Sequence, residues 1–110
     1  MSVSPTIEER PGGVTAARGF RAAGVRAGVK RQKKDVALVV SAVPCSAAAT
    51  FTTNRVQAAP IHVTRRHLQA GPVRAIVVNS GNANACNGPQ GEADARRMTE
   101  LVAERLGIKP

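Results

Sequence analysis

The stretch RAIVVNSGNANACNGPQGEADARRM, residues 74–98, joins three different patterns in one continuous segment. The apolar run RAIVV, residues 74–78, is typical of a strand. The polar loop that follows contains four Asn, and Asn87-Gly88 is a strong turn pair. Apolar residues then recur at helical spacing, which predicts a helix over 91–106. We therefore expect a β-loop-α unit, a kind of junction at which ligands often bind.

The expected helix has an apolar side and a charged side. Glu92 with Arg96, and Asp94 with Arg97, are spaced for ion pairs on the charged side. Gly107 suits the carboxy-terminal cap because Gly adopts the left-handed conformation without strain. The residues expected on the apolar side are Ala95, Met98, Leu101, Val102 and Leu106.

Before this unit, patterning of period two predicts several strands. Residues 19–29 alternate loosely between polar and apolar. Residues 36–43 form a nearly continuous apolar run, which is typical of a strand buried on both faces, and Pro44 ends it. The fold class expected from strands followed by a β-loop-α unit is α/β.

Two more strands and a short helix are expected in the middle of the chain. One strand covers 48–53, and another covers 56–63, where Pro60 indicates an edge or a bulge. Thr64 can cap a short helix over 65–70. The Gly-Pro pair after residue 70 ends that helix.

The chain is long enough for one domain, but its apolar content is unusual. Of its 110 residues 43% are hydrophobic, yet there are only two Phe, no Trp and no Tyr. Ala and Val bury little area per residue, so a self-sufficient core is hard to build from them. We expect residues 1–13 to be a flexible arm and residues 14–110 to be part of something larger.

Positive charge is concentrated in the first third of the chain. The formal net charge is +9, and the run at residues 30–34 reads KRQKK. Such a patch can bind nucleic acid or an acidic partner. Because no aromatic residue adjoins the run and no nucleic-acid motif is present, a solvated turn between two strands is the favoured interpretation.

Most familiar catalytic and ligand motifs do not occur. The Asn-rich loop lacks the spacing of a dinucleotide or phosphate loop, and His62 and His67 have no acidic or Cys ligand in register for a metal site. Cys45 and Cys86 are interpreted as reduced thiols of a cytoplasmic protein. The amino terminus lacks the apolar core of a signal peptide, and no apolar run approaches the ~20 residues of a membrane helix.

Three long motifs in the same order carry a resemblance to a known family. They are GGVTAARGFRAAGVRAGVK, KKDVALVVSAVPCSAAATFTTNRVQAAP and RAIVVNSGNANACNGPQGEADARRM. Over about residues 12–108 the chain closely resembles the amino-terminal part of the ornithine acetyltransferase family, of the ArgJ type. Cys45 is a minor departure, since Ala is commoner there in such sequences.

The resemblance implies an acetyl transfer from N-acetylornithine, and in some members from acetyl-CoA, to glutamate in arginine biosynthesis. In such enzymes the precursor cleaves itself before a threonine, which then carries the acetyl group, and a Thr-Gly pair forms the oxyanion hole. The implied fold is a self-processing α/β sandwich with stacked sheets between helices. No other cofactor is implied. The implied partners are the remaining α-chain and the β-chain of the same precursor, in an oligomer of αβ units.

The motifs that hold the nucleophile and the oxyanion pair do not occur between Met1 and Pro110. We therefore assign no catalytic residue, and we expect the 110-residue chain alone to be inactive. Asn79, Asn82 and Asn84 are the candidate substrate-binding residues, although a scaffold role for the Asn-rich loop is favoured. Two alternatives stay open: a small basic nucleic-acid-binding protein, and part of a related self-processing amidohydrolase or aminopeptidase.

Overall fold

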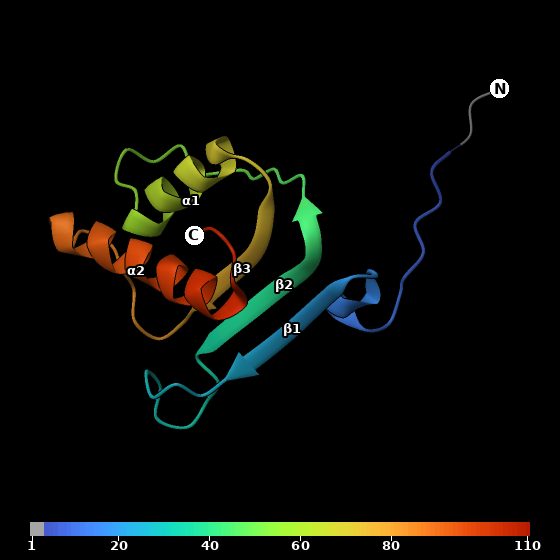
Figure 1. The fold of residues 1–110 in the computed structure, drawn as a ribbon, viewed down its shortest axis with the longest axis horizontal. Helices are drawn as coiled ribbons and strands as arrows, with labels where there is room; N and C mark the ends of the chain where they lie inside the picture. Colours follow the sequence, from blue (N-terminus) through green and yellow to red (C-terminus); the bar gives the residue numbers. More distant parts are fainter. Residues whose placement is uncertain (1–3) are drawn as a thin grey trace.

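The computed structural model describes residues 4–110, which form a three-stranded sheet with two helices on one of its faces (Figure 1). The elements in chain order are the short 3-10 helix η1 (Gly13–Ala16), β1 (Phe20–Val25), β2 (Val36–Cys45), α1 (Ala59–Ala70), β3 (Val73–Asn79) and α2 (Gly88–Leu106). The fold is therefore mixed α/β, as expected from the sequence.

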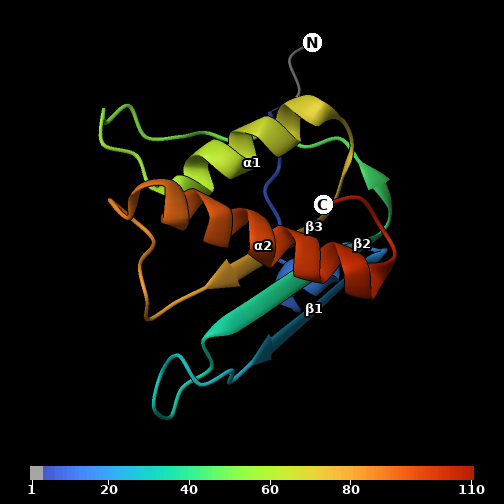
Figure 2. The same cartoon turned by 60° about the vertical axis from the view of Figure 1, so that its left-hand side comes forward.

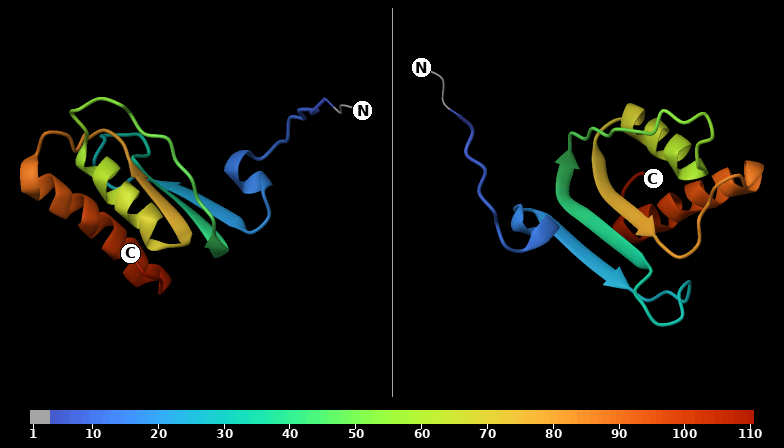
Figure 3. Two further views of the ribbon diagram at one scale, coloured as in Figure 1. Left: turned by 90° about the horizontal axis from the view of Figure 1, so that it is seen from above. Right: turned by 180° about the vertical axis from the view of Figure 1, so that it is seen from behind.

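The strand order is β1-β2-β3, and both pairings are antiparallel. β1 and β3 consequently run in the same direction and end at the same end of the sheet. Two loops begin there: the loop after β1, which returns to β2, and the loop after β3, which leads to α2 (Figure 3). The topology thus brings the basic run and the Asn-rich segment to one end of the molecule.

The two faces of the sheet have different surroundings. Leu38 pairs with Val77 and Val40 with Ala75 on the face that the helices cover, which both Figure 2 and Figure 3 show from the side. Within residues 4–110 β2 is covered on one face only, whereas the sequence predicted a strand buried on both faces. The other, which we call the open sheet face, carries Phe20, Val39, Ile76 and Val78.

The core between the sheet and the helices is thin. Only Val63, Ala95 and Ala103 are buried apolar residues in the described part of the chain. On the open sheet face, Ile76 is 58% exposed and Val78 is 52% exposed. Because transfer of apolar area out of water is the main driving force for folding, this distribution supports the expectation that further layers complete the domain.

The end of β2 contains an irregularity that the sequence pattern did not predict. The pairing register shifts between Val40 and Cys45, so β2 continues past Pro44 instead of ending there. The buried hydroxyl of Ser41 donates to the carbonyl of Val43 at 2.6 Å. The guanidinium of Arg74 donates to the Ser41 carbonyl at 3.1 Å from the neighbouring strand. These bonds satisfy backbone groups that the bulge leaves without strand partners.

The two strands expected over 48–53 and 56–63 are wrong. Residues 46–58 form a long irregular connection. Phe51 of this connection packs against α1, where the guanidinium of Arg65 lies 4.8 Å from the centre of the Phe51 ring. The helix expected over 65–70 begins at Ala59 instead, so Thr64 lies inside it. Pro60 occupies the first turn, where the missing N–H has no intrahelical partner to lose. A proline that was interpreted as a strand edge is therefore a helix start.

α2 confirms the strongest prediction from the sequence, with corrections in detail. It begins at Gly88 and ends at Leu106, and the N–H of the following Gly107 bonds to the Ala103 carbonyl in a left-handed cap. Leu101 is 47% exposed, so its place on the apolar side is wrong, and Ala103 is buried there. The two ion pairs expected within the helix do not form.

The charged side chains of α2 reach partners other than those expected. Glu92 pairs with Arg66 of α1 at 2.7 Å, which links the two helices. Arg97 pairs with Glu104 at 3.0 Å and with Glu100 at 3.4 Å. A residue on another element was therefore a better partner for Glu92 than the one four positions along the same helix.

Candidate functional site

The candidate site is the Asn loop, residues 79–88, which connects the end of β3 to the start of α2. Its first amide belongs to Asn79, whose Nδ2 donates to the carbonyl of Asn82 at 3.0 Å. This bond closes a tight turn that begins at the last residue of β3. Gly81 adopts the left-handed backbone conformation within that turn, which Gly does without strain.

Asn84 joins the Asn loop to the first turn of α2. Its Nδ2 donates to the carbonyl of Gly91 at 2.6 Å, and its Oδ1 accepts from Nδ2 of Asn87 at 3.0 Å. Gly91 is buried at this contact, and a Cβ there would lie 2.5 Å from the Asn84 oxygen. A side chain at position 91 would therefore displace Asn84 or Asn87.

The remaining residues of the Asn loop are open to solvent. Asn82 and Cys86 are exposed, and Cys86 has a left-handed backbone with a φ of 57°. A residue with a side chain is held in that conformation at some cost, so the loop is shaped by its own hydrogen bonds. Of the three predicted site residues, Asn79 bonds within the loop, Asn84 bonds to the first turn of α2, and Asn82 is exposed to solvent.

The neighbouring basic hairpin loop, residues 26–35, is organised by a carboxylate. Asp35 is only 3% exposed, and its carboxylate accepts from the backbone N–H groups of Ala27, Val29 and Lys30 at 2.6, 2.8 and 2.9 Å. These hydrogen bonds, the one from Ala27 first, lower the pKa of Asp35 below its usual range. Asp35 was not singled out from the sequence, although its place directly after KRQKK and before a strand is typical of a turn-forming carboxylate.

Two contacts hold the basic hairpin loop beside the Asn loop. The N–H of Ser80 donates to the carbonyl of Asp35 at 2.8 Å. The aliphatic stem of Lys30 packs so closely against Gly81 that a Cβ there would lie 2.7 Å from the lysine Cγ. Figures 1 and 3 show these loops side by side at the same end of the sheet.

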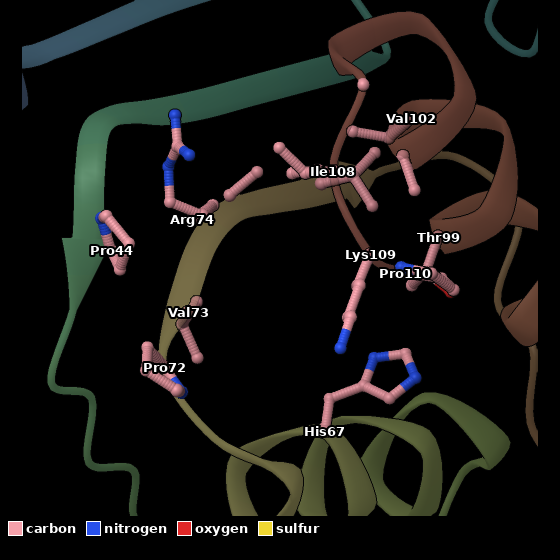
Figure 4. Close-up of a pocket in the computed structure, with 14 residues that line it drawn as sticks. Pro44, His67, Pro72, Val73, Arg74, Thr99, Val102, Ile108, Lys109 and Pro110 are labelled. Carbon is pink, nitrogen blue, oxygen red and sulfur yellow. The ribbon is translucent and has the colours of Figure 1, made fainter.

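A hollow of about 480 Å³ lies at the opposite end of β3, between the sheet and the ends of both helices (Figure 4). Its walls are mostly apolar, and His67 and Lys109 face each other across one side of it. Arg74 is at its rim, with its guanidinium bonded to the bulge of β2. None of the predicted site residues lines this hollow.

Neither a metal centre nor a membrane span is found in residues 4–110. No group of three or more His, Cys, Asp or Glu side chains lies within reach of one metal ion in that range. The described helices are also too short or too polar to cross a bilayer.

Taken together, the fold and the loop define a β-loop-α segment of a mixed α/β protein whose polar loop is built by Asn side chains. A model of the ArgJ family matches residues 21–110, and the chain belongs to that family. The resemblance drawn from the three motifs is therefore confirmed.

Two of the curated relatives show how much of such a protein is present. The arginine biosynthesis bifunctional protein ArgJ of Symbiobacterium thermophilum is 56% identical over 107 residues, covering 94% of this chain and 27% of the relative. The protein of the same name from Bacillus cereus is 50% identical over 110 residues, covering 99% of this chain and 27% of the relative. The chain thus spans about 27% of the length of these relatives.

Two solved structures have the same arrangement of elements. The arginine biosynthesis bifunctional protein ArgJ of Bacillus halodurans gives a TM-score of 0.87 at 47% identity, covering 89% of this chain and 52% of that one. The ornithine acetyltransferase of Mycobacterium tuberculosis, solved with ornithine, gives 0.80 at 51% identity, covering 86% and 50%. The present chain is therefore similar to part of these proteins in both sequence and fold.

Proposed function

We propose that the chain is the amino-terminal segment of a cytoplasmic acetyltransferase of arginine biosynthesis, which moves an acetyl group from N-acetylornithine to glutamate. One observation carries the proposal: the chain has 51% identity and a TM-score of 0.80 to an ornithine acetyltransferase solved with ornithine. The word bifunctional in the names of its relatives supports a second acetyl donor, for which we propose acetyl-CoA.

The proposed reaction needs a nucleophile outside these 110 residues. A threonine hydroxyl attacks the acetyl carbonyl of N-acetylornithine, the C–N bond breaks, and ornithine leaves with the hydroxyl proton on its amine. The amine of glutamate then attacks the acetyl ester, the C–O bond breaks, and the threonine hydroxyl is restored. Preorganised N–H or hydroxyl donors stabilise the oxyanion in each step.

Relative lengths support a cleaved precursor. Nearly the same segment makes up 27% of the curated relatives but 52% of the solved chain from Bacillus halodurans. The solved chain thus has about half the length of those relatives, since 0.27 divided by 0.52 is about one half. We propose that residues 14–110 belong to the amino-terminal half of such a precursor, that residues 1–13 precede the folded part, and that αβ units assemble further.

The open sheet face supports the proposed sandwich. Phe20, Ile76 and Val78 present apolar area to solvent on a face that no described element covers. In the complete protein we propose that a second sheet packs there, at the spacing usual for stacked sheets. The arrangement is then helices, sheet, sheet, helices, which is the stacked sandwich implied by the resemblance.

The free edge of β3 indicates where the Asn loop lies relative to the catalytic groups. A strand that follows α2 and returns to the sheet beside β3 would run parallel to it, because α2 brings the chain back to the end of the sheet where β3 begins, with Ile108 near Val73. The end of that strand then lies next to the Asn loop. In the family that the chain resembles, this strand is expected to carry the Thr-Gly oxyanion pair. We therefore propose that the Asn loop lies beside the active-site cleft and supports it.

Within the proposed cleft, the amides have separate tasks. Asn79 and Asn84 fix the loop backbone through the bonds described above. Asn82 is the amide that remains available for a substrate, since its side chain is exposed. A scaffold role for the loop as a whole is supported more strongly than direct substrate contact.

The test is an acetyl-transfer assay with a full-length protein that contains this segment. Acetylglutamate should form from N-acetylornithine and glutamate in the absence of acetyl-CoA. A related hydrolase would instead release free acetate and ornithine without acetylating glutamate. Formation of acetate alone would therefore refute transfer and favour the hydrolase alternative.

A further inference from the structure

The basic hairpin loop gathers more positive charge than any other short segment of the chain. Its ten residues, 26–35, contain five cationic side chains and one carboxylate. The cations are Arg26, Lys30, Arg31, Lys33 and Lys34. Since the Asp35 carboxylate is turned inward to backbone N–H groups, the cations rather than the acid face solvent.

Among residues 4–110 none of these cations forms an ion pair with a carboxylate. The ion pairs within 4 Å in that range use Arg10, Arg66 and Arg97, none of which lies in the loop. Exposed like charges repel one another, so their clustering costs free energy unless an anion binds. A merely solvated turn, the interpretation favoured from the sequence, does not explain why five cationic side chains are clustered here.

The loop is also held in one shape, as a binding surface requires. Three backbone N–H groups converge on Asp35, and Ser80 of the Asn loop bonds to its carbonyl. Lys30 packs its stem on Gly81, which holds its ammonium group near the exposed edge of the Asn loop. Cations and neutral amide donors therefore lie at one end of the sheet, a combination that suits phosphate oxygens.

We propose that the basic hairpin loop, with the adjoining Asn loop, binds the phosphate groups of a coenzyme A thioester that serves as acetyl donor. This inference rests on the proposed function, in which the Asn loop borders the active-site cleft. A coenzyme A thioester carries its phosphates on a long pantetheine arm, so they can contact the basic hairpin loop while the acetyl group reaches the cleft.

A small phosphate ester fits this surface better than a nucleic acid strand. Proteins that bind single strands combine cations with aromatic side chains on which bases stack. The chain has only two aromatic residues, Phe20 and Phe51, and neither lies in the basic hairpin loop or the Asn loop. The surface thus offers charge and amides, which suit phosphates, without a platform for bases.

The experiment uses the full-length protein with Arg31→Gln and Lys33→Gln combined. Lys30 stays unchanged because its stem packs on Gly81. A matched control, Arg18→Gln with Arg105→Gln, removes the same charge at exposed sites outside both loops. Far-ultraviolet circular dichroism and self-cleavage show whether each variant is folded, and Arg31→Gln alone serves if the double variant is not.

The expected result is a KM for acetyl-CoA about three- to tenfold higher in the loop variant, the range for two exposed ion contacts. The dependence of this KM on salt should also become weaker. The KM for N-acetylornithine and all constants of the control variant should stay the same. An unchanged KM for acetyl-CoA in the loop variant would overturn the proposal.

Separate binding measurements distinguish failure of this proposal from failure of the proposed function. Calorimetry should detect binding of coenzyme A, weakened in the loop variant, and no such dependence for pantetheine, which lacks the phosphates. If N-acetylornithine is a donor but coenzyme A neither reacts nor binds, the proposed function stands and the phosphate site is wrong. If neither donor reacts, the calorimetry alone decides about the phosphate site. Loss of duplex DNA binding in the loop variant, with coenzyme A binding unchanged, would mark a nucleic-acid surface and also overturn the proposal.

Discussion

Replacing Gly91 with alanine tests whether the Asn loop and α2 are one packed unit. Helix propensity alone favours the change, because Ala is more stable than Gly inside a helix by about 1 kcal/mol. The packing opposes it. The new Cβ would lie 2.5 Å from Oδ1 of Asn84 and 2.8 Å from Cβ of Asn87. The sign of the change in stability therefore shows whether helix propensity or packing dominates.

The magnitude follows from what must move. Overpacking of a tight contact costs about 1–3 kcal/mol. If Asn84 swings away instead, it loses its bonds to Gly91 and Asn87, at about 0.5–1.5 kcal/mol each. Against these costs stands a gain of about 1 kcal/mol from propensity. Subtracting the gain from either cost gives a net local destabilisation of up to about 2 kcal/mol.

Hydrogen exchange of the backbone amides in a full-length protein is the suitable assay, because it reports local opening. Amides of residues 84–95 should exchange faster in Gly91→Ala, by up to about thirtyfold, since about 1.4 kcal/mol corresponds to tenfold. In an Asn84→Ala background the same change should cost less, because the clash with Oδ1 is gone. Slower exchange in Gly91→Ala would mean that propensity dominates and that the packed unit does not exist.

Three further outcomes follow from the same structure. Asp35→Asn should lower the midpoint of urea unfolding at neutral pH. Because the folded-state pKa of Asp35 is lowered, its contribution is present above its usual pKa of 3.8 and is lost as the pH falls through the folded-state value, so the two midpoints should converge in acid. Asn84→Ala should reduce self-cleavage yield and thermal stability more than turnover per folded molecule, whereas Asn82→Ala should raise the KM with normal melting; the reverse split would exchange their roles. The 110-residue chain by itself should bind a hydrophobic dye through the open sheet face and transfer no acetyl group, and a clean monomer with a sharp thermal transition would contradict the first part.

The sequence predicted well those elements whose pattern is local. β2, β3 and α2 have long apolar runs or strong helical spacing, and each was placed to within a few residues. Gly107 was predicted as a helix cap for a backbone reason that depends on that residue alone. Local physics was sufficient at these places.

Elements whose structure depends on distant partners were missed. The connection from 46 to 58 has β-forming residues, but Phe51 meets Arg65 of α1 rather than a neighbouring strand. Pro60 is compatible with a strand edge and with a helix start, and the sequence alone does not separate the two. Glu92 forms an ion pair with Arg66, which comes near only after the two helices have packed.

The candidate site shows the same division. Four Asn in a short loop predicted a polar turn; the amide of Asn79 bonds within it, and the amide of Asn84 bonds to the first turn of α2. The role of Asp35 was not predicted, because its three hydrogen bonds to backbone N–H groups form only when the loop has folded around it. The meeting of both loops depends on strand order, which no local pattern contains.

The most direct test of the proposed function is the mass of the cleaved full-length protein after incubation with N-acetylornithine alone. We expect the carboxy-terminal chain to gain the mass of one acetyl group at its first residue, a threonine, and to lose it again when glutamate is added. Acetylglutamate formed without any acetylated chain, under conditions that trap the intermediate, would contradict an acetyl-threonine mechanism. A full-length protein that neither becomes acetylated nor transfers acetyl would contradict the proposed function itself.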